Sequence, residues 1–174
     1  MSAEVADTIF STPVYPAEAA RVAASRRILV TQDNGLPGAE RLLTQFKDQG
    51  GPLLVLSPRS VGQRFEEMLG ESLGKAQVGT RLYVCGDEAF LWQVRALARQ
   101  AGLLDEEIEM FRSGARRRLY CVHCSTLQDI GEVDSSVCTG CGVRLMVRNH
   151  FSRRLGAYAG VCLDPNDPRG EGCA

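Results

Sequence analysis

Two Cys-x-x-Cys pairs lie close together in the second half of the chain and constrain its fold more than any other feature. Cys121 and Cys124 form the first pair, and Cys138 and Cys141 form the second, with 13 residues between the pairs. This spacing is typical of a zinc ribbon or a rubredoxin-like site, in which each pair turns tightly and directs two thiolates at one ion. We therefore predict a four-cysteine metal site in residues 119–148.

The size of this segment supports a metal. About 30 residues cannot bury enough apolar surface to fold without a crosslink, and four thiolates around an ion provide one. Gly140 and Gly142 suit the second turn, where a positive φ or a close backbone approach is expected. Free thiols or a thioredoxin-like redox pair are the alternative, although neither pair is predicted to open a helix, the setting that lowers the pKa of a thiol.

The four cysteines alone do not identify the metal, because a tetrahedral set of four sulfurs accepts zinc or iron. We expect zinc, since the loop between the pairs is polar and Tyr120 is the one aromatic residue beside the site. Iron remains the alternative, which would make the module an electron carrier. His123 lies inside the first pair, and we expect it to be exposed rather than a ligand.

The first half of the chain alternates short apolar runs with helical periodicity. Residues 27–31, 52–56, 81–85 and 107–111 are predicted strands, and the segment after each of the first three has apolar residues at helical spacing. Strands that alternate with helices in this way form parallel sheets. We predict an α/β fold, a small three-layer domain with a parallel sheet, followed by the four-cysteine module.

Composition adds little beyond this division. With 44% hydrophobic residues, the chain is expected to fold, and its longest apolar runs are too short to cross a membrane. The start shows no basic and apolar leader, so we expect a cytoplasmic protein with reduced cysteines. Residues 112–154 contain 8 basic and 3 acidic residues in a chain of net charge −1. Such a basic segment suits an acidic protein or a nucleic acid.

The expected organisation has six parts. In order along the chain, they are an N-terminal arm (1–26), the α/β domain (27–111), a basic linker (112–118), the metal ribbon (119–148), a partner-docking segment (149–163) and a mobile tail (164–174).

Residues 81–111, "RLYVCGDEAFLWQVRALARQAGLLDEEIEMF", are similar to the last strand, helix and strand of the NAD(P)-binding module of the ferredoxin reductase superfamily. The resemblance makes Gly35, Cys85 and Gly86 candidates for cofactor binding. The early loop contains acidic Asp33 and Glu40, whose carboxylates would repel a phosphate. We therefore expect a scaffold that keeps the sheet rather than a working nucleotide site.

The segment after the cysteines, "HFSRRLGAY" at residues 150–158, is the most distinctive part of the sequence. Together with the first half, it resembles the small subunit of bacterial dimethylamine monooxygenase over essentially the whole chain. The resemblance implies one component of an NAD(P)H-dependent complex that converts dimethylamine to methylamine and formaldehyde. Flavin, iron-sulfur, heme and NAD(P)H sites are then expected in the reductase and oxygenase partners, with no catalytic residue here.

The same segment has the composition of a docking surface. Arg153 and Arg154 offer guanidinium groups for carboxylates, Phe151 and Tyr158 offer apolar anchors, and His150 lies beside them. A solvated basic face is the alternative interpretation. A nucleic-acid-binding zinc ribbon is a further alternative, but we do not expect a nucleic acid as partner because basic and aromatic residues do not interleave as in base-stacking surfaces.

Overall fold

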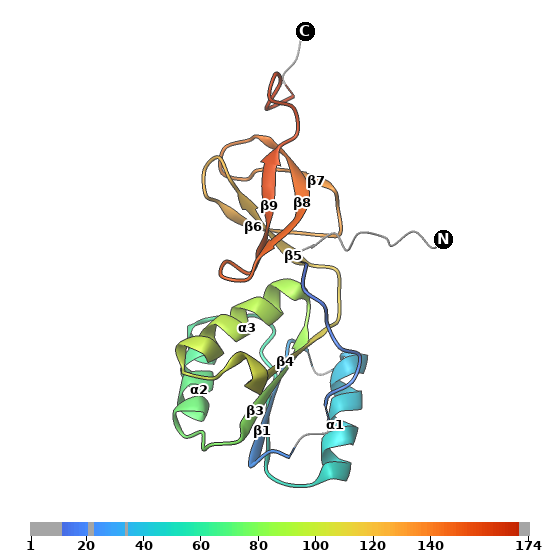
Figure 1. Ribbon diagram of the computed structural model, residues 1–174, viewed down its shortest axis with the longest axis vertical. Helices are drawn as coiled ribbons and strands as arrows, with labels where there is room; N and C mark the ends of the chain where they lie inside the picture. Colours follow the sequence, from blue (N-terminus) through green and yellow to red (C-terminus); the bar gives the residue numbers. More distant parts are fainter. Residues whose placement is uncertain (1–11, 21–22, 34, 171–174) are drawn as a thin grey trace, which may run out of the picture. The chain divides into compact units, whose positions relative to one another are not determined.

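The computed structural model describes residues 12–20, 23–33 and 35–170 (Figure 1). Residues 1–11 and 21–22 of the expected arm, and 171–174 of the expected tail, lie outside the described residues. Contacts divide the chain into two compact units, Tyr15–Arg117 and a second unit built mainly from Arg118 onward.

The first unit is the predicted three-layer α/β fold. Its four strands are parallel and lie in the order β2-β1-β3-β4. Helix α1 covers one face of the sheet, and α2 and α3 cover the other (Figure 1). The elements are β1 (Arg26–Thr31), α1 (Pro37–Gln49), β2 (Leu53–Leu56), α2 (Gln63–Gly74), β3 (Thr80–Gly86), α3 (Glu88–Gln100), a 3-10 turn (Asp105–Glu107) and β4 (Ile108–Arg112).

The core of this unit follows from its sequence pattern. Strands β1 and β3 are buried almost throughout, as expected for central strands with both faces covered by helices. Pro37 opens α1, where its fixed φ suits the first helical position. Helix α1 then buries Leu42 and Phe46 against the sheet, with Tyr83 in the same cluster. The sequence therefore located all four strands of this sheet.

The second unit is a five-stranded sheet in the order β6-β5-β9-β8-β7. Strands β5 and β9 are parallel, whereas β8 pairs antiparallel with both β7 and β9. A small core forms around Leu119, Leu145, Phe151 and Tyr158. The strands are β5 (Arg117–Cys121), β6 (Leu127–Ile130), β7 (Ser135–Val137), β8 (Arg144–Ser152) and β9 (Ala157–Cys162).

This topology corrects two expectations about the organisation of the chain. Residues 149–163 are not a segment separate from the ribbon, because they supply the end of β8 and the whole of β9, which lies between β5 and β8. The basic linker is also shorter than 112–118, since β4 ends at Arg112 and β5 begins at Arg117.

Among the described helices, none combines the length and the apolar character that a membrane crossing requires.

Candidate metal centre

The two Cys-x-x-Cys pairs form turns of the same design. The Ser125 amide donates to the Cys121 carbonyl, and the Gly142 amide donates to the Cys138 carbonyl, each at 2.9 Å. Ser125 and Gly142 both have positive φ angles, of 63° and 75°. Glycine takes this conformation without strain, as predicted for Gly142, while Ser125 takes it in the first turn.

The turns bring four sulfur atoms together. The Sγ atoms of Cys121, Cys124, Cys138 and Cys141 all lie within 4.8 Å of one another. The Cys121–Cys141 distance is 3.8 Å and the Cys124–Cys138 distance is 3.5 Å, far longer than the roughly 2.05 Å of a disulfide. Zinc–sulfur bonds of about 2.3 Å in a tetrahedron place sulfurs about 3.8 Å apart, so the residues fit a four-sulfur metal site.

Backbone amides and one hydroxyl group point at these sulfurs. The amides of His123 and Cys124 donate to Cys121, although burial dominates there and raises the pKa of the Cys121 thiol to about 12. At Cys124 the opposite holds: hydrogen bonds from the Thr126 hydroxyl and amide lower its pKa to about 6. The turns therefore already stabilise one thiolate, the form that binds a metal.

Thr126 is a site residue that sequence reasoning missed. Its Oγ1 lies 3.1 Å from Cys124 Sγ. A Cβ on Gly140 would lie 2.2 Å from that oxygen and 3.3 Å from Cys124 Sγ, so glycine is required there for the two turns to approach. The predicted close approach at Gly140 is confirmed. The hydroxyl two residues after Cys124 was visible in the sequence, but its contact with the second turn depends on the fold.

Replacing Thr126 with Val should weaken metal binding by the chain about tenfold to hundredfold, because the Cys124 thiolate loses its hydroxyl donor while the shape of the side chain is retained. Competition with a chromophoric chelator measures this affinity. Thr126→Ser is the matched control, since it keeps the hydroxyl group. Equal affinities for the Val and Ser variants would exclude a role for the hydrogen bond.

His123, Cys162 and Cys85 are not part of the four-sulfur cluster. His123 is exposed and is not part of the sulfur cluster, as expected. Cys162 is half-buried, with its thiol 3.2 Å from the Asp164 carbonyl. Cys85 is fully buried, and burial raises the pKa of its thiol to about 11, so it is a neutral core residue. Cys173 lies outside the described residues.

The three candidate cofactor residues do not converge on an open site. Gly35 is exposed, and a Cβ added to it would meet no other part of the protein within 4 Å. Cys85 lies under the start of α1, where a Cβ on Gly38 would approach its sulfur at 3.1 Å. A Cβ on Gly86 would meet Phe90 at 2.6 Å and Gln32 at 2.9 Å. Gly86 therefore serves packing between β3 and α3.

A closed hydrogen-bond network lies where α/β proteins usually bind ligands. The strand order reverses between β1 and β3, and their carboxyl ends normally border the ligand crevice. Here the Asp87 carboxylate accepts from Gln32 Nε2 at 2.8 Å, Arg116 Nε at 2.9 Å and the Phe90 amide at 2.9 Å. The three donors are already used by the Asp87 carboxylate, whose negative charge would also repel a phosphate at this position.

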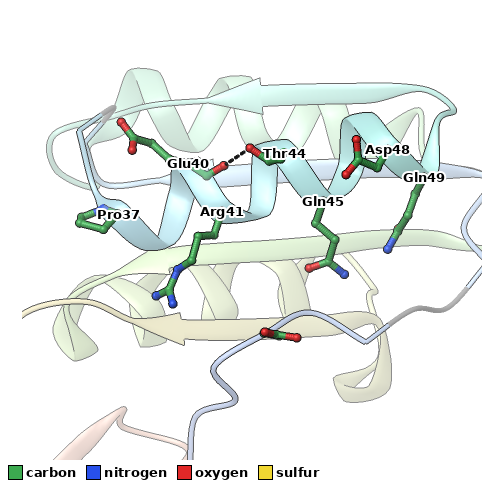
Figure 2. Close-up of a pocket in the computed structure, with 8 residues that line it drawn as sticks. Pro37, Glu40, Arg41, Thr44, Gln45, Asp48 and Gln49 are labelled. Atoms are coloured by element: carbon green, nitrogen blue, oxygen red, sulfur yellow. Dashed lines mark hydrogen bonds between the residues drawn. The ribbon is translucent and has the colours of Figure 1, made fainter.

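Another hollow of this unit runs along α1, with a volume of about 1020 Å³ (Figure 2). Three carboxylates, on Glu18, Glu40 and Asp48, line it against one guanidinium, on Arg41. The Thr44 hydroxyl donates a hydrogen bond to the Glu40 carbonyl of the same helix, as Figure 2 shows. This acidic groove is also unsuited to a phosphate.

The five expected docking residues divide into two groups. His150, Arg153 and Arg154 are exposed. Phe151 and Tyr158 are only 3% and 5% exposed, and their rings pack edge to face with centroids 4.9 Å apart. The expectation that these two aromatic residues anchor a partner is therefore wrong, because their side chains form the core between β8 and β9.

Comparisons with known proteins agree on one family. The family described as dimethylamine monooxygenase subunit DmmA-like matches through its N-terminal domain at residues 59–108 and its C-terminal domain at residues 118–161. The heme-dependent oxidative N-demethylase delta subunit of Ectopseudomonas mendocina (strain ymp) is 43% identical over 169 residues, which cover 97% of both chains.

A solved structure, phthalate dioxygenase reductase, matches with a TM-score of 0.38 and 12% identity. The match covers 69% of this chain and 47% of the reductase, about half of its length. The two matched domains and the extent of the identity to the N-demethylase subunit together establish that this chain belongs to the DmmA-like family of dimethylamine monooxygenase subunits.

Proposed function

We propose that this chain is a non-catalytic or electron-transfer-assisting subunit of a multicomponent NAD(P)H-dependent amine monooxygenase that demethylates dimethylamine to methylamine and formaldehyde. The observation that carries the proposal is a four-sulfur cluster on two matching turns, in a chain 43% identical to the delta subunit of a heme-dependent oxidative N-demethylase. The reductase and oxygenase subunits of the complex would be its partners.

Zinc is the proposed metal, held by Cys121, Cys124, Cys138 and Cys141. When bound, it would crosslink the two turns. Four thiolates fill a tetrahedral site and leave no position for water or substrate, which is the arrangement of structural rather than catalytic zinc. In this proposal the ribbon module is a metal-dependent scaffold, and residues 27–111 are a reductase-like domain that supports assembly.

NAD(P)H, flavin, iron-sulfur and heme chemistry would belong to the partner subunits. Two features of the α/β unit support this division. The Asp87 network occupies the usual ligand crevice, and the candidates Gly35, Cys85 and Gly86 do not meet around an open site. The cytoplasm, where thiols stay reduced, is the proposed compartment.

An iron-containing electron carrier in the same complex is the second candidate. One observation favours it: Cys124 is exposed, so an edge of the sulfur cluster reaches the surface. Electron transfer to or from a partner would require such an edge. Zinc cannot exchange electrons, so the identity of the metal separates the two candidates.

We expect the full chain, purified without added metal, to contain about one zinc ion and to be colourless. We also expect it to copurify with the other subunits, and a complex lacking it to lose dimethylamine-dependent NAD(P)H oxidation by at least about tenfold. Metal analysis, an absorption spectrum and an NAD(P)H oxidation assay measure these properties. Visible thiolate-to-iron absorption would establish the iron candidate, and full activity without the chain would refute the proposed subunit role.

A further inference from the structure

The hairpin of β8 and β9 carries a concentration of positive charge. Residues 144–154 contain four arginines and one histidine with no acidic residue. Arg148, His150, Arg153 and Arg154 are all exposed, and we call these four residues the basic edge. All four residues belong to one short segment, the last part of β8 and the turn that follows it.

A bulge in β8 spans the first two members of the basic edge, Arg148 and His150. Val147 pairs with Gly160 and Phe151 pairs with Tyr158, so three residues of β8 lie opposite the single residue Ala159 of β9. The two extra residues break the regular alternation of the strand. Residues 148–150 are consequently exposed in succession, while Phe151 returns to the core. Bulges commonly redirect side chains at functional sites.

The three arginines of the basic edge have no carboxylate partner in the part of the chain that the structure describes. Across residues 12–20, 23–33 and 35–170, no carboxylate forms an ion pair with Arg148, Arg153 or Arg154. Arginines elsewhere differ in this respect: Arg81 pairs with Glu109 at 3.1 Å, and Arg116 pairs with Asp87 at 2.9 Å. The protein thus uses many of its guanidinium groups internally but leaves these three available.

A hollow of about 480 Å³ adjoins the bulge. Arg148 and His150 line it together with half-buried Met146 and Val147, and Asp134 supplies one carboxylate. The hollow therefore combines a partly apolar lining with one guanidinium group and one imidazole. It could receive a side chain from another protein while the guanidinium groups bind carboxylates around it.

We propose that the basic edge binds a carboxylate-rich face of a neighbouring subunit in the N-demethylase complex. This inference rests on the proposed function and names the chemistry of the partner surface. Planar guanidinium groups match carboxylates in a bidentate manner, and these three, which have no carboxylate partner among the described residues, are available to anions of another protein. Electrostatic complementarity of this kind sets the orientation and the association rate of subunits.

A nucleic acid is a poorer fit to the same surface. Proteins that bind single strands stack bases on exposed aromatic side chains between basic residues. The two aromatic residues of this hairpin, Phe151 and Tyr158, are buried against each other and cannot stack on a base. Because both rings are buried, an acidic protein is a better candidate partner for this surface than RNA or DNA.

The test replaces Arg148, Arg153 and Arg154 together with Gln in the full chain, which is then combined with the other subunits of the complex. We expect subunit association to weaken about tenfold to hundredfold at low salt, and the difference from wild type to shrink as salt rises, because exposed charge pairs are screened. Replacement of Arg41, Arg59 and Arg64 with Gln is the matched control, since it removes three exposed arginines from the α/β unit. Unchanged metal content verifies that the ribbon is folded.

Three outcomes would overturn the inference. If the wild-type chain associates but the triple variant binds as tightly with the same salt dependence, the inference fails and the proposed function stands. If the wild-type chain does not associate at all, both fail. If the wild-type chain binds a fluorescent duplex DNA or single-stranded RNA near physiological salt and the triple variant does not, the surface is a nucleic-acid site instead.

Discussion

Replacing Cys138 with Ser is expected to unfold the ribbon unit and abolish subunit assembly, while the α/β unit stays folded. Cys138 is 2% exposed, and its sulfur lies 3.5 Å from that of Cys124. The ribbon has a small apolar core, so most of its stability should come from the metal, whose binding in comparable modules contributes about 10–16 kcal/mol. The α/β unit should survive because its core of parallel strands and helices contains none of the four ligands.

Hydrogen exchange followed by mass spectrometry resolves the two units. Amides of β5, β8 and β9 should lose protection in the Cys138→Ser variant, while those of β1 and β3 keep it. Trp92, the single tryptophan of the chain, lies in α3 and gives an independent signal for the α/β unit. Cys162→Ser is the matched control, because Cys162 lies in β9 outside the sulfur cluster. Retained protection of β8 and β9 without metal would show that the ribbon folds by its apolar core.

The elements that the sequence predicted correctly are those whose signals are local. Strands β1 and β3 have almost continuous apolar runs because helices cover both faces of their sheet. The cysteine turns are equally local, since each is formed by two cysteines at this spacing and the positive-φ residue that follows, Ser125 in the first turn and Gly142 in the second. Thiolate ligands at such spacings can converge on one ion with little help from the rest of the fold.

The aromatic residues of the hairpin show where local reasoning failed. Phe151 and Tyr158 lie among basic residues in the sequence, which indicated a surface segment. The bulge at residues 148–150 adds two residues to β8, so three residues in succession are exposed while Phe151 stays on the buried face of the strand with Leu145. An insertion of this kind is determined by pairing with β9, and neither strand pattern contains that pairing.

Asp87 is another residue whose role depends on distant parts of the chain. Its partners Gln32 and Arg116 lie 55 and 29 residues away in the sequence. Its carboxylate also caps α3 by accepting from the Phe90 amide. Long-range hydrogen bonds of this type join β1, β3 and the segment after β4, and they become visible only when the sheet order is known.

We expect Asp87→Ala to destabilise the α/β unit by about 2–4 kcal/mol, the second largest effect among the variants considered. Loss of a helix cap costs about 1 kcal/mol. Removing the carboxylate also leaves Gln32 without its acceptor and Arg116 without its ion-pair partner, which adds a further cost of about 1–3 kcal/mol. The discount for solvent is moderate, because the Asp87 side chain is 10% exposed while that of Arg116 is 46% exposed.

Urea denaturation followed by Trp92 fluorescence measures this change, because Trp92 is buried in the helix that Asp87 caps. Asp87→Asn separates the contributions: the amide still accepts from Phe90, so this variant should lose less stability than Asp87→Ala. Asp48→Ala is the control, since Asp48 is an exposed carboxylate on α1.

If Asp87→Ala were as stable as the Asp48 control, the network at the carboxyl ends of β1 and β3 would not hold the unit together. The proposal that this network takes the place of a nucleotide site would then lose its support. A large loss of stability, in contrast, would show that the position where related folds bind ligands has become part of the scaffold.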